Sequence, residues 1–192
     1  MAALGLVTGT SGNVSMRLGQ DDNGIELMAI TPSGQPYDRL AADDVVAVDF
    51  EGEPVEGELI PSSESLLHVA IYQARPEVGA VIHTHSVFSS ALAVARLEIP
   101  AVIDEVTITI GGPIRVSRYA FPSTQELADH VCAALEDRKA ALISNHGAVS
   151  VGRDLEEALH VCTLLERAGE EALCLPPGDL VSFIAEESGY LA

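Results

Sequence analysis

Two histidines separated by one residue carry the clearest chemical signal in the sequence. His83 and His85 stand at the end of an apolar run over residues 80–84, which is typical of a buried strand. Successive side chains of a strand point to opposite faces, so side chains two positions apart point the same way. Two imidazoles placed in this way can bind one metal ion, although two histidines at a strand end can also simply face solvent.

A third histidine favours the metal hypothesis. His146 follows a second apolar run, over residues 140–144, and precedes Gly147, which permits a sharp turn. The ends of two strands in one sheet can meet at one point. Three histidines with a fourth position open to water or substrate form a zinc set that is typical of catalytic sites. Imidazole suits zinc, with nickel, cobalt or iron as alternatives.

Glu64 is the candidate general base. It lies in the first turn of a predicted helix over residues 62–75, where the helix dipole alone also favours an acid. A nearby dication would lower the pKa of its carboxyl group, whereas burial against apolar side chains would raise it. The other histidines, His68, His130 and His160, are expected to be structural.

Three turns rich in small polar residues could hold an anion. They cover residues 9–13, 31–34 and 61–64. Backbone N–H groups at the start of a helix, together with the hydroxyls of Ser62 and Ser63, form a natural anion site that needs no lysine. Turns of this composition are also common without any ligand, so each of them alone is a weak signal.

The chain is strongly acidic. Its 192 residues include 10 basic and 29 acidic side chains, for a formal net charge of −19. Nucleic acid and anionic membranes would be repelled by this charge, so neither is expected as a partner. The only lysine, Lys139, lies between a predicted helix and a predicted strand, which argues against Schiff-base and P-loop chemistry.

The composition predicts a single domain over residues 1–192 and a cytoplasmic location. Hydrophobic residues make up 47% of the chain, enough for a sizeable core. The first residues lack the pattern of a signal peptide, and no apolar run has the length of a membrane span. Cys132, Cys162 and Cys174 show no Cys-x-x-Cys spacing and are expected to be reduced.

Periodicity and turn residues predict alternating strands and helices. The predicted strands cover residues 13–18, 25–30, 45–49, 80–84, 140–144 and 148–151, with two more short strands within 102–116. The predicted helices cover residues 62–75 and 87–96, then one from a capping box at 123–126 to 138, and a long one from 154 onward. Since the first strands resemble hairpins, the pattern favours a three-layer α/β/α fold with a mixed, largely antiparallel central sheet.

Five motifs taken together resemble the class II aldolase/adducin family over about residues 9–172. In chain order they are Gly9-Thr-Ser-Gly-Asn-Val-Ser, Thr31-Pro-Ser-Gly, Pro61-Ser-Ser-Glu, His83-Thr-His and Asn145-His-Gly. Their order and spacing are similar to those of the family, and this is far more specific than any one motif.

The resemblance implies a role for each matching residue. His83, His85 and His146 match the zinc ligands, and Glu64 matches the acid/base. The residues that match the phosphate cradle are Asn13, Ser33, Gly34, Ser62 and Ser63. The implied cofactor is Zn²⁺, the implied substrate is a small phosphorylated sugar, and the implied assembly is a homotetramer with active sites between neighbouring subunits.

The activity that the resemblance implies is a retro-aldol cleavage. A phosphorylated ketose similar to L-fuculose 1-phosphate would yield dihydroxyacetone phosphate and an aldehyde, with zinc as the Lewis acid and Glu64 as the proton carrier. A tyrosine that serves a neighbouring subunit in the family is replaced here by Asp104 and Glu105. These two acids, or Tyr190 near the C-terminus, are the candidate secondary proton donors.

Other activities remain open at this point. Ribulose-phosphate 4-epimerases and methylthioribulose-phosphate dehydratases share the zinc set and the phosphate turns. A non-enzymatic scaffold like the adducin head is disfavoured, because that head lacks the metal histidines. A cupin is also disfavoured, because residues 87–95 contain no acid and have the pattern of a helix.

Overall fold

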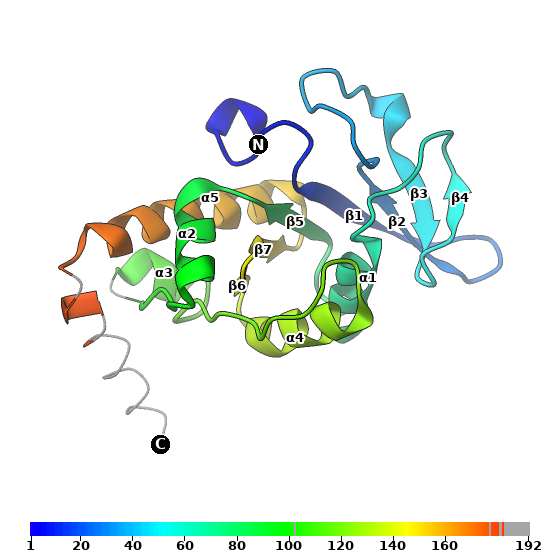
Figure 1. The fold of residues 1–192 in the computed structure, drawn as a ribbon. Helices are drawn as coiled ribbons and strands as arrows, with labels where there is room; N and C mark the ends of the chain where they lie inside the picture. The colour runs from blue at the N-terminus through cyan, green and yellow to red at the C-terminus, as the bar shows by residue number, and fades with distance from the viewer. Residues whose placement is uncertain (102, 177, 181, 183–192) are drawn as a thin grey trace.

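A seven-stranded antiparallel sheet forms the centre of the molecule (Figure 1). The computed structural model describes residues 1–101, 103–176, 178–180 and 182. The spatial order of the strands is β4-β3-β2-β1-β5-β7-β6. Their bounds are β1 Asn13–Gln20, β2 Glu26–Ile30, β3 Val46–Asp49, β4 Pro54–Glu56, β5 Ala80–Thr84, β6 Ala140–Ile143 and β7 Gly147–Gly152. Each pair of neighbouring strands is antiparallel. Within the described residues, β6 also forms one isolated parallel bridge, between Leu142 and Val116.

Helices cover both faces of the sheet, as the pattern predicted. Their bounds are α1 Ser65–Ala74, α2 Val87–Ala95, α3 Asp104–Thr109, α4 Gln125–Leu135 and α5 Leu155–Cys174, and two 3₁₀ turns cover Ala2–Leu4 and Ala42–Asp44. The side chains of β5, β6 and β7 alternate between the two faces of the sheet: Val81 and Ile143 pack with α1 and α4, whereas Leu142 packs with α2, α3 and α5, and Ile82 packs with α5. This alternation is the period of two that an extended strand imposes, and it confirms the three-layer α/β/α prediction.

Most of the predicted elements are present, with small changes at their ends. The strand over residues 80–84 is confirmed at both ends as β5. The third predicted helix is capped by Thr124, whose side chain accepts a hydrogen bond from the backbone N–H of Leu127, one residue later than the predicted capping box. The edge strand β4 was not predicted, because its three residues are all exposed and show no alternation of apolar and polar side chains.

The segment after Pro100 corrects the sequence analysis. Two strands were predicted within residues 102–116, but residues 104–109 form the helix α3. Its β-branched residues favour a strand by propensity. Val106 and Ile110 lie one helical turn apart, however, and both are buried in the core against α5, so tertiary packing outweighs the local preference.

The sheet register brings three chain segments to one point. β5 lies between β1 and β7, with Asn13 opposite His83 on one side and Ala148 opposite Thr84 on the other. The carboxyl end of β5 therefore meets the amino ends of β1 and β7. None of the helices in the described residues is long and apolar enough to cross a membrane.

Removal of the cap of α5 should destabilise the fold. The carboxylate of Asp154 accepts a 2.8 Å hydrogen bond from the N–H of Glu157, and the carboxylate of Glu157 accepts one of 2.7 Å from the N–H of Arg153. We expect Asp154→Ala to lower the free energy of unfolding by about 1 kcal/mol, as measured by urea denaturation. Asp154→Asn should retain most of the stability, since Asn caps as well as Asp. An alanine variant as stable as the parent would contradict this assignment.

Candidate metal centre

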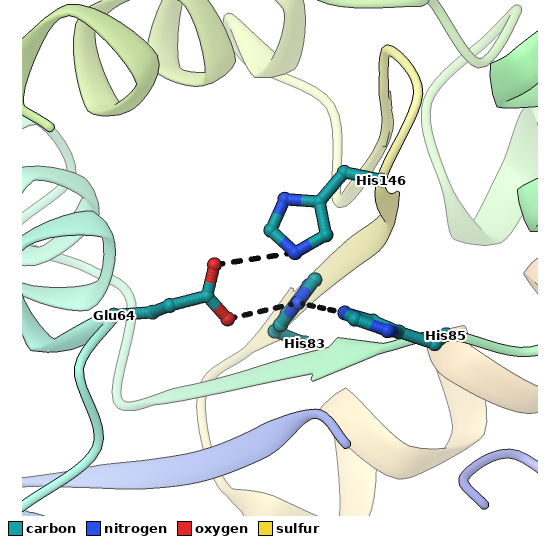
Figure 2. Close-up of side chains that lie close together, drawn as sticks. All are labelled: Glu64, His83, His85 and His146. Carbon is teal, nitrogen blue, oxygen red and sulfur yellow. Dashed lines mark hydrogen bonds and ion pairs between the residues drawn. The ribbon is translucent and has the colours of Figure 1, made fainter. Parts of the chain in front are cut away.

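Four side chains from three segments converge at the carboxyl end of β5. His83 and His85 come from β5 and the residue after it, His146 from the turn before β7, and Glu64 from the residue before α1. One ligand atom from each lies within 4.8 Å of all the others. Figure 2 shows the carboxylate of Glu64 facing the three imidazoles.

The three imidazoles surround a common point. The centroids of each pair of rings are 4.8 Å apart, and the ring planes cross at 72–76°. The Nε2 atoms of His83 and His85 are 3.0 Å apart. One oxygen of Glu64, Oε2, lies 3.1 Å from Nε2 of His83, and the other, Oε1, lies 3.3 Å from Nε2 of His146. Nε2 of His83 and Nε2 of His146 thus face the carboxylate, and Nε2 of His85 faces Nε2 of His83.

These spacings fit a divalent metal ion. A tetrahedral zinc ion with bonds of about 2.0–2.1 Å holds its ligand atoms about 3.3 Å apart, close to the separations between the described atoms. Imidazole nitrogens and a carboxylate oxygen are a donor set that first-row transition metals accept. Oε1 of Glu64 is buried without a hydrogen bond to any described residue. The residues present therefore fit a metal ion.

A backbone contact fixes the tautomer of His83. Its Nδ1 lies 2.9 Å from the carbonyl oxygen of Ala148, which can only accept a hydrogen bond. Nδ1 must carry a proton, so in the neutral ring the lone pair of Nε2 points into the cluster. A second hydrogen bond of this kind is the usual way in which proteins orient a metal-binding histidine.

The turn that carries His146 differs in detail from the prediction. Asn145, and not Gly147, adopts the left-handed conformation, with φ of 58°. Gly147 is required for another reason: a Cβ atom there would lie 2.2 Å from the carbonyl oxygen of Thr84. The glycine lets β7 approach the end of β5 closely, and this approach brings His146 to His83 and His85.

Glu64 is held in an environment with opposing influences. Burial raises the pKa of its carboxyl, but a hydrogen bond accepted from protonated His83, the charges that His83 and His146 carry when protonated, and a hydrogen bond from Asn13 outweigh burial and lower the pKa to about 2. Glu64 is the residue before α1, and its side chain does not cap the helix. The carboxylate instead faces the histidines, so the helix dipole is not the reason for an acid at this position.

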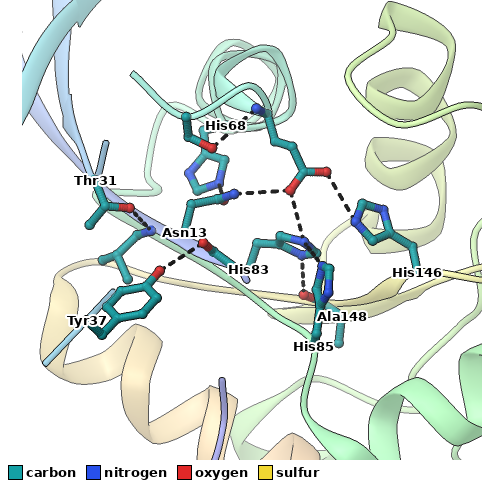
Figure 3. Close-up of polar contacts among 12 residues, drawn as sticks. Asn13, Thr31, Tyr37, His68, His83, His85, His146 and Ala148 are labelled. Carbon is teal, nitrogen blue, oxygen red and sulfur yellow. Dashed lines mark hydrogen bonds and ion pairs between the residues drawn. The ribbon is translucent and has the colours of Figure 1, made fainter. Parts of the chain in front are cut away.

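The three polar turns are tied together beside the cluster (Figure 3). The N–H of Ser33 donates to the carbonyl of Ile60, which joins the second turn to the third. The hydroxyl of Thr31 accepts a hydrogen bond from the N–H of Val14, and the hydroxyl of Tyr37 donates to the carbonyl of Gly12. These bonds bring turns from distant parts of the sequence into one region.

The predicted phosphate residues have unequal access. Ser33, Gly34 and Ser63 are exposed, whereas Ser62 and Asn13 are buried. The hydroxyl of Ser62 accepts a hydrogen bond from the N–H of Glu64. A phosphate group can therefore be reached most directly by the exposed donors of this region.

Two of the candidate secondary proton donors, Asp104 and Glu105, lie outside the cluster. Glu105 is in the first turn of α3 and forms a 3.0 Å ion pair with Arg167 of α5. Asp104 is exposed in the same turn. Neither has a hydrogen bond or ion pair with the four cluster residues among the described contacts, and Tyr190 lies outside the described residues.

Comparison with known proteins places this geometry in a family. The family model described as Class II Aldolase and Adducin N-terminal domain matches residues 1–173. The chain belongs to the class II aldolase and adducin family. An L-fuculose phosphate aldolase from Escherichia coli is 42% identical over 159 residues, which cover 83% of this chain and 71% of the relative.

Two further relatives of the class II aldolase type support the assignment. A 5-methylthioribulose-1-phosphate/5-deoxyribulose-1-phosphate aldolase from Rhodospirillum rubrum is 41% identical over 171 residues, 89% of this chain and 74% of the relative. The solved structure of an L-fuculose 1-phosphate aldolase has a TM-score of 0.80 and 32% identity, and covers 95% of this chain and 88% of the other. Membership of the class II aldolase family, with aldolases among the named relatives, identifies the chain as a lyase.

Loss of one cluster histidine should abolish metal binding without unfolding the protein. We expect His83→Ala and His146→Ala to lose stoichiometric zinc after dialysis, because each variant removes one ligand of a small set. The measurement is metal content per chain, with the thermal unfolding midpoint as a check on folding. His160→Ala, at an exposed position of α5, is the control. A folded His83→Ala or His146→Ala variant with one zinc per chain would contradict the ligand assignment.

Proposed function

We propose that the chain is a zinc-dependent aldolase that cleaves a phosphorylated ketose, similar to L-fuculose 1-phosphate, into dihydroxyacetone phosphate and an aldehyde. The observation that carries this proposal is the carboxylate of Glu64 in contact with Nε2 of both His83 and His146, beside turns rich in hydrogen-bond donors. The named substrates of the relatives, L-fuculose phosphate and methylthioribulose 1-phosphate, support the class of substrate.

In this proposal the protein binds the phosphate and the carbonyl of the substrate, which lie on the same side of the reacting bond. The donors of Ser33, Gly34 and Ser63 bind the phosphate, with Ser62 and Asn13 supporting the same region. His83, His85 and His146 would hold the metal ion. When bound, a zinc ion supplies Lewis-acid stabilisation of negative charge on the substrate carbonyl oxygen. Lys139 is not needed, since its amine is bound to Glu157 by a 2.7 Å ion pair far along the chain from these turns.

Glu64 carries the proton in the proposed reaction. In cleavage, the hydroxyl on C4 loses its proton and becomes the aldehyde carbonyl, and the electron pair of the C3–C4 bond passes to C3 and the adjacent carbonyl. Glu64 takes up a proton from the solvent and gives it to C3, which completes dihydroxyacetone phosphate. In the synthetic direction the same carboxylate removes that proton. Asp104, Glu105 and Tyr190 are candidates for the group that receives the C4 hydroxyl proton.

We also propose that these sites form within a homotetramer in the cytoplasm, with the whole chain as one domain. Two valines of α2 support an assembly, because Val87 is 67% exposed and Val94 is 62% exposed. Tyr119 and Phe121 are likewise largely exposed. Val87 and Val94 lie two turns apart on α2 and so on one side of the helix, and an exposed apolar face is typical of an interface with another protein chain.

The cleavage reaction can be tested directly. We expect the zinc-loaded protein to release dihydroxyacetone phosphate from L-fuculose 1-phosphate, and a chelated sample to release none. The measurement is dihydroxyacetone phosphate over time in both samples. Epimerisation of a pentulose phosphate, or loss of water from methylthioribulose 1-phosphate, without any cleavage would instead support one of the two alternative activities on the same site.

Replacement of Glu64 by its amide should separate proton transfer from metal binding. Glu64→Gln retains the size of the side chain but removes the proton carrier, so we expect full zinc content and a rate lower by about 10²–10⁴-fold. The measurements are metal content and the rate of dihydroxyacetone phosphate release. An unchanged rate would exclude Glu64 from the mechanism.

A further inference from the structure

A line of hydrogen bonds runs from Glu64 into the core of the protein. It joins Glu64, Asn13, His68, Ser15 and Tyr72, and each of the last four is buried. Figure 3 shows His68 beside Asn13, on the side away from the three cluster imidazoles. Among the described residues, the ring of His68 has no hydrogen bond or ion pair with the four cluster residues, so Asn13 is its hydrogen-bonded link to the site.

The direction of each hydrogen bond follows from the carboxylate. An ionised carboxylate can only accept hydrogen bonds. The atom of Asn13 that lies 3.1 Å from Oε2 of Glu64 is therefore Nδ2, which donates, and Oδ1 of Asn13 faces Nε2 of His68. An amide oxygen also can only accept, so Nε2 of His68 carries a proton and donates it to Asn13.

The rest of the line fixes the tautomer of His68. The ring is fully buried, and its pKa is lowered to about 3 by burial, with a further lowering from His83 that outweighs the opposite effect of Glu64, so the ring is neutral. A neutral ring with a proton on Nε2 accepts at Nδ1, and Oγ of Ser15 is 2.6 Å away to donate. The hydroxyl of Tyr72 in turn donates to Ser15 across 2.8 Å. The donor and the acceptor of each hydrogen bond in the line are thus assigned.

The position of His68 in the fold suits an orienting role. His68 lies one helical turn after Glu64, so its ring is held on the same side of α1. Ser15 and Asn13 are two residues apart on β1 and point to the same face, and both contact His68. The imidazole therefore ties the helix that follows Glu64 to the strand that carries its hydrogen-bond donor.

We propose that His68 is a positioning residue: its Nε2–H holds the amide of Asn13 with Nδ2 toward Glu64, and this amide fixes Oε2 of Glu64, so that Oε1, which accepts no hydrogen bond from a described residue, carries the proton. The proposal rests on the proposed role of Glu64 in proton transfer. In this proposal one N–H of the Asn13 amide donates to Glu64. Only the second N–H of that amide is then available to a phosphate group. The opposite orientation of Asn13 would place Oδ1 against the carboxylate, where two acceptors repel each other.

The first test needs no substrate. Nitrogen-15 NMR of the histidine rings in the parent protein reports which nitrogen of each ring carries the proton, and the signal that disappears in His68→Gln is that of His68. We expect a neutral ring with the proton on Nε2, and a mixture of tautomers in Asn13→Ala, where the acceptor is missing. A proton on Nδ1 of His68 in the parent protein would overturn the proposal, whatever the enzyme's activity.

The second test separates orientation from folding and from metal binding. His68→Leu removes the donor to Asn13, whereas His68→Gln offers an amide N–H at about the position of Nε2. We expect His68→Leu to retain zinc and KM but to lower kcat by about 10- to 100-fold, the usual cost of losing an outer contact of a metal site, and His68→Gln to restore most of the rate. The control for folding is the thermal unfolding midpoint of both variants.

The readout specific to Glu64 is exchange of a C3 proton of dihydroxyacetone phosphate with D₂O, which requires proton transfer but no cleavage of a carbon–carbon bond. We expect it to fall in His68→Leu in parallel with kcat. Unchanged exchange and kcat in a folded, zinc-loaded His68→Leu variant would overturn the proposal. If the zinc-loaded parent shows neither exchange nor cleavage, the proposed function fails, and the tautomer of His68 still decides the orientation of Asn13.

Discussion

The antiparallel register of β5 between β1 and β7 is the constraint on which the rest of the site depends. It places His83 opposite Asn13 and brings the amino end of β7 against the carbonyl of Thr84. A residue with a Cβ atom at position 147 would not fit against that carbonyl. A shift of β5 by one residue would turn both of its histidines to the other face of the sheet. The metal cluster is therefore a consequence of strand pairing more than of local sequence.

The electrostatics of the site differ from those of the chain as a whole. The protein has a net charge of −19, yet the cluster presents three imidazoles to a single carboxylate, and the turns beside it present hydroxyl and N–H donors. These groups would attract the proposed phosphorylated substrate locally even though the overall charge would repel it. Most of the few cationic side chains form ion pairs elsewhere on the molecule, as Lys139 does with Glu157.

Two layers of contacts control the reactive groups. The inner layer is the cluster itself, and the outer layer consists of the carbonyl of Ala148, which sets the tautomer of His83, and the Asn13 amide, which contacts Glu64. The outer layer comes from β1 and β7, the two strands that flank β5. The sheet that brings the cluster residues together therefore also carries the groups that orient them.

The sequence by itself determined the family, the three-layer fold and the identity of the side chains that could bind a metal ion or transfer a proton. Those conclusions depend on residue types, strand alternation and the order of motifs, which are local properties of the chain. His83 and His85 share a direction because of the period of a strand, so their pairing could be predicted without coordinates.

The tertiary structure alone decided three other matters. Residues 104–109 are helical because a helix lets Val106 and Ile110 pack in the core against α5. Local propensity does not predict this packing. The pKa of Glu64 is low because hydrogen bonds and charges from histidines in other segments outweigh burial. Asn13 bonds to both His68 and Glu64 because α1 lies against β1. Ser15 of β1 and His68 of α1, which are also hydrogen-bonded, are 53 residues apart in the sequence. Each outcome depends on contacts between residues that are distant in sequence, and such contacts exist only once the sheet and its helices have assembled.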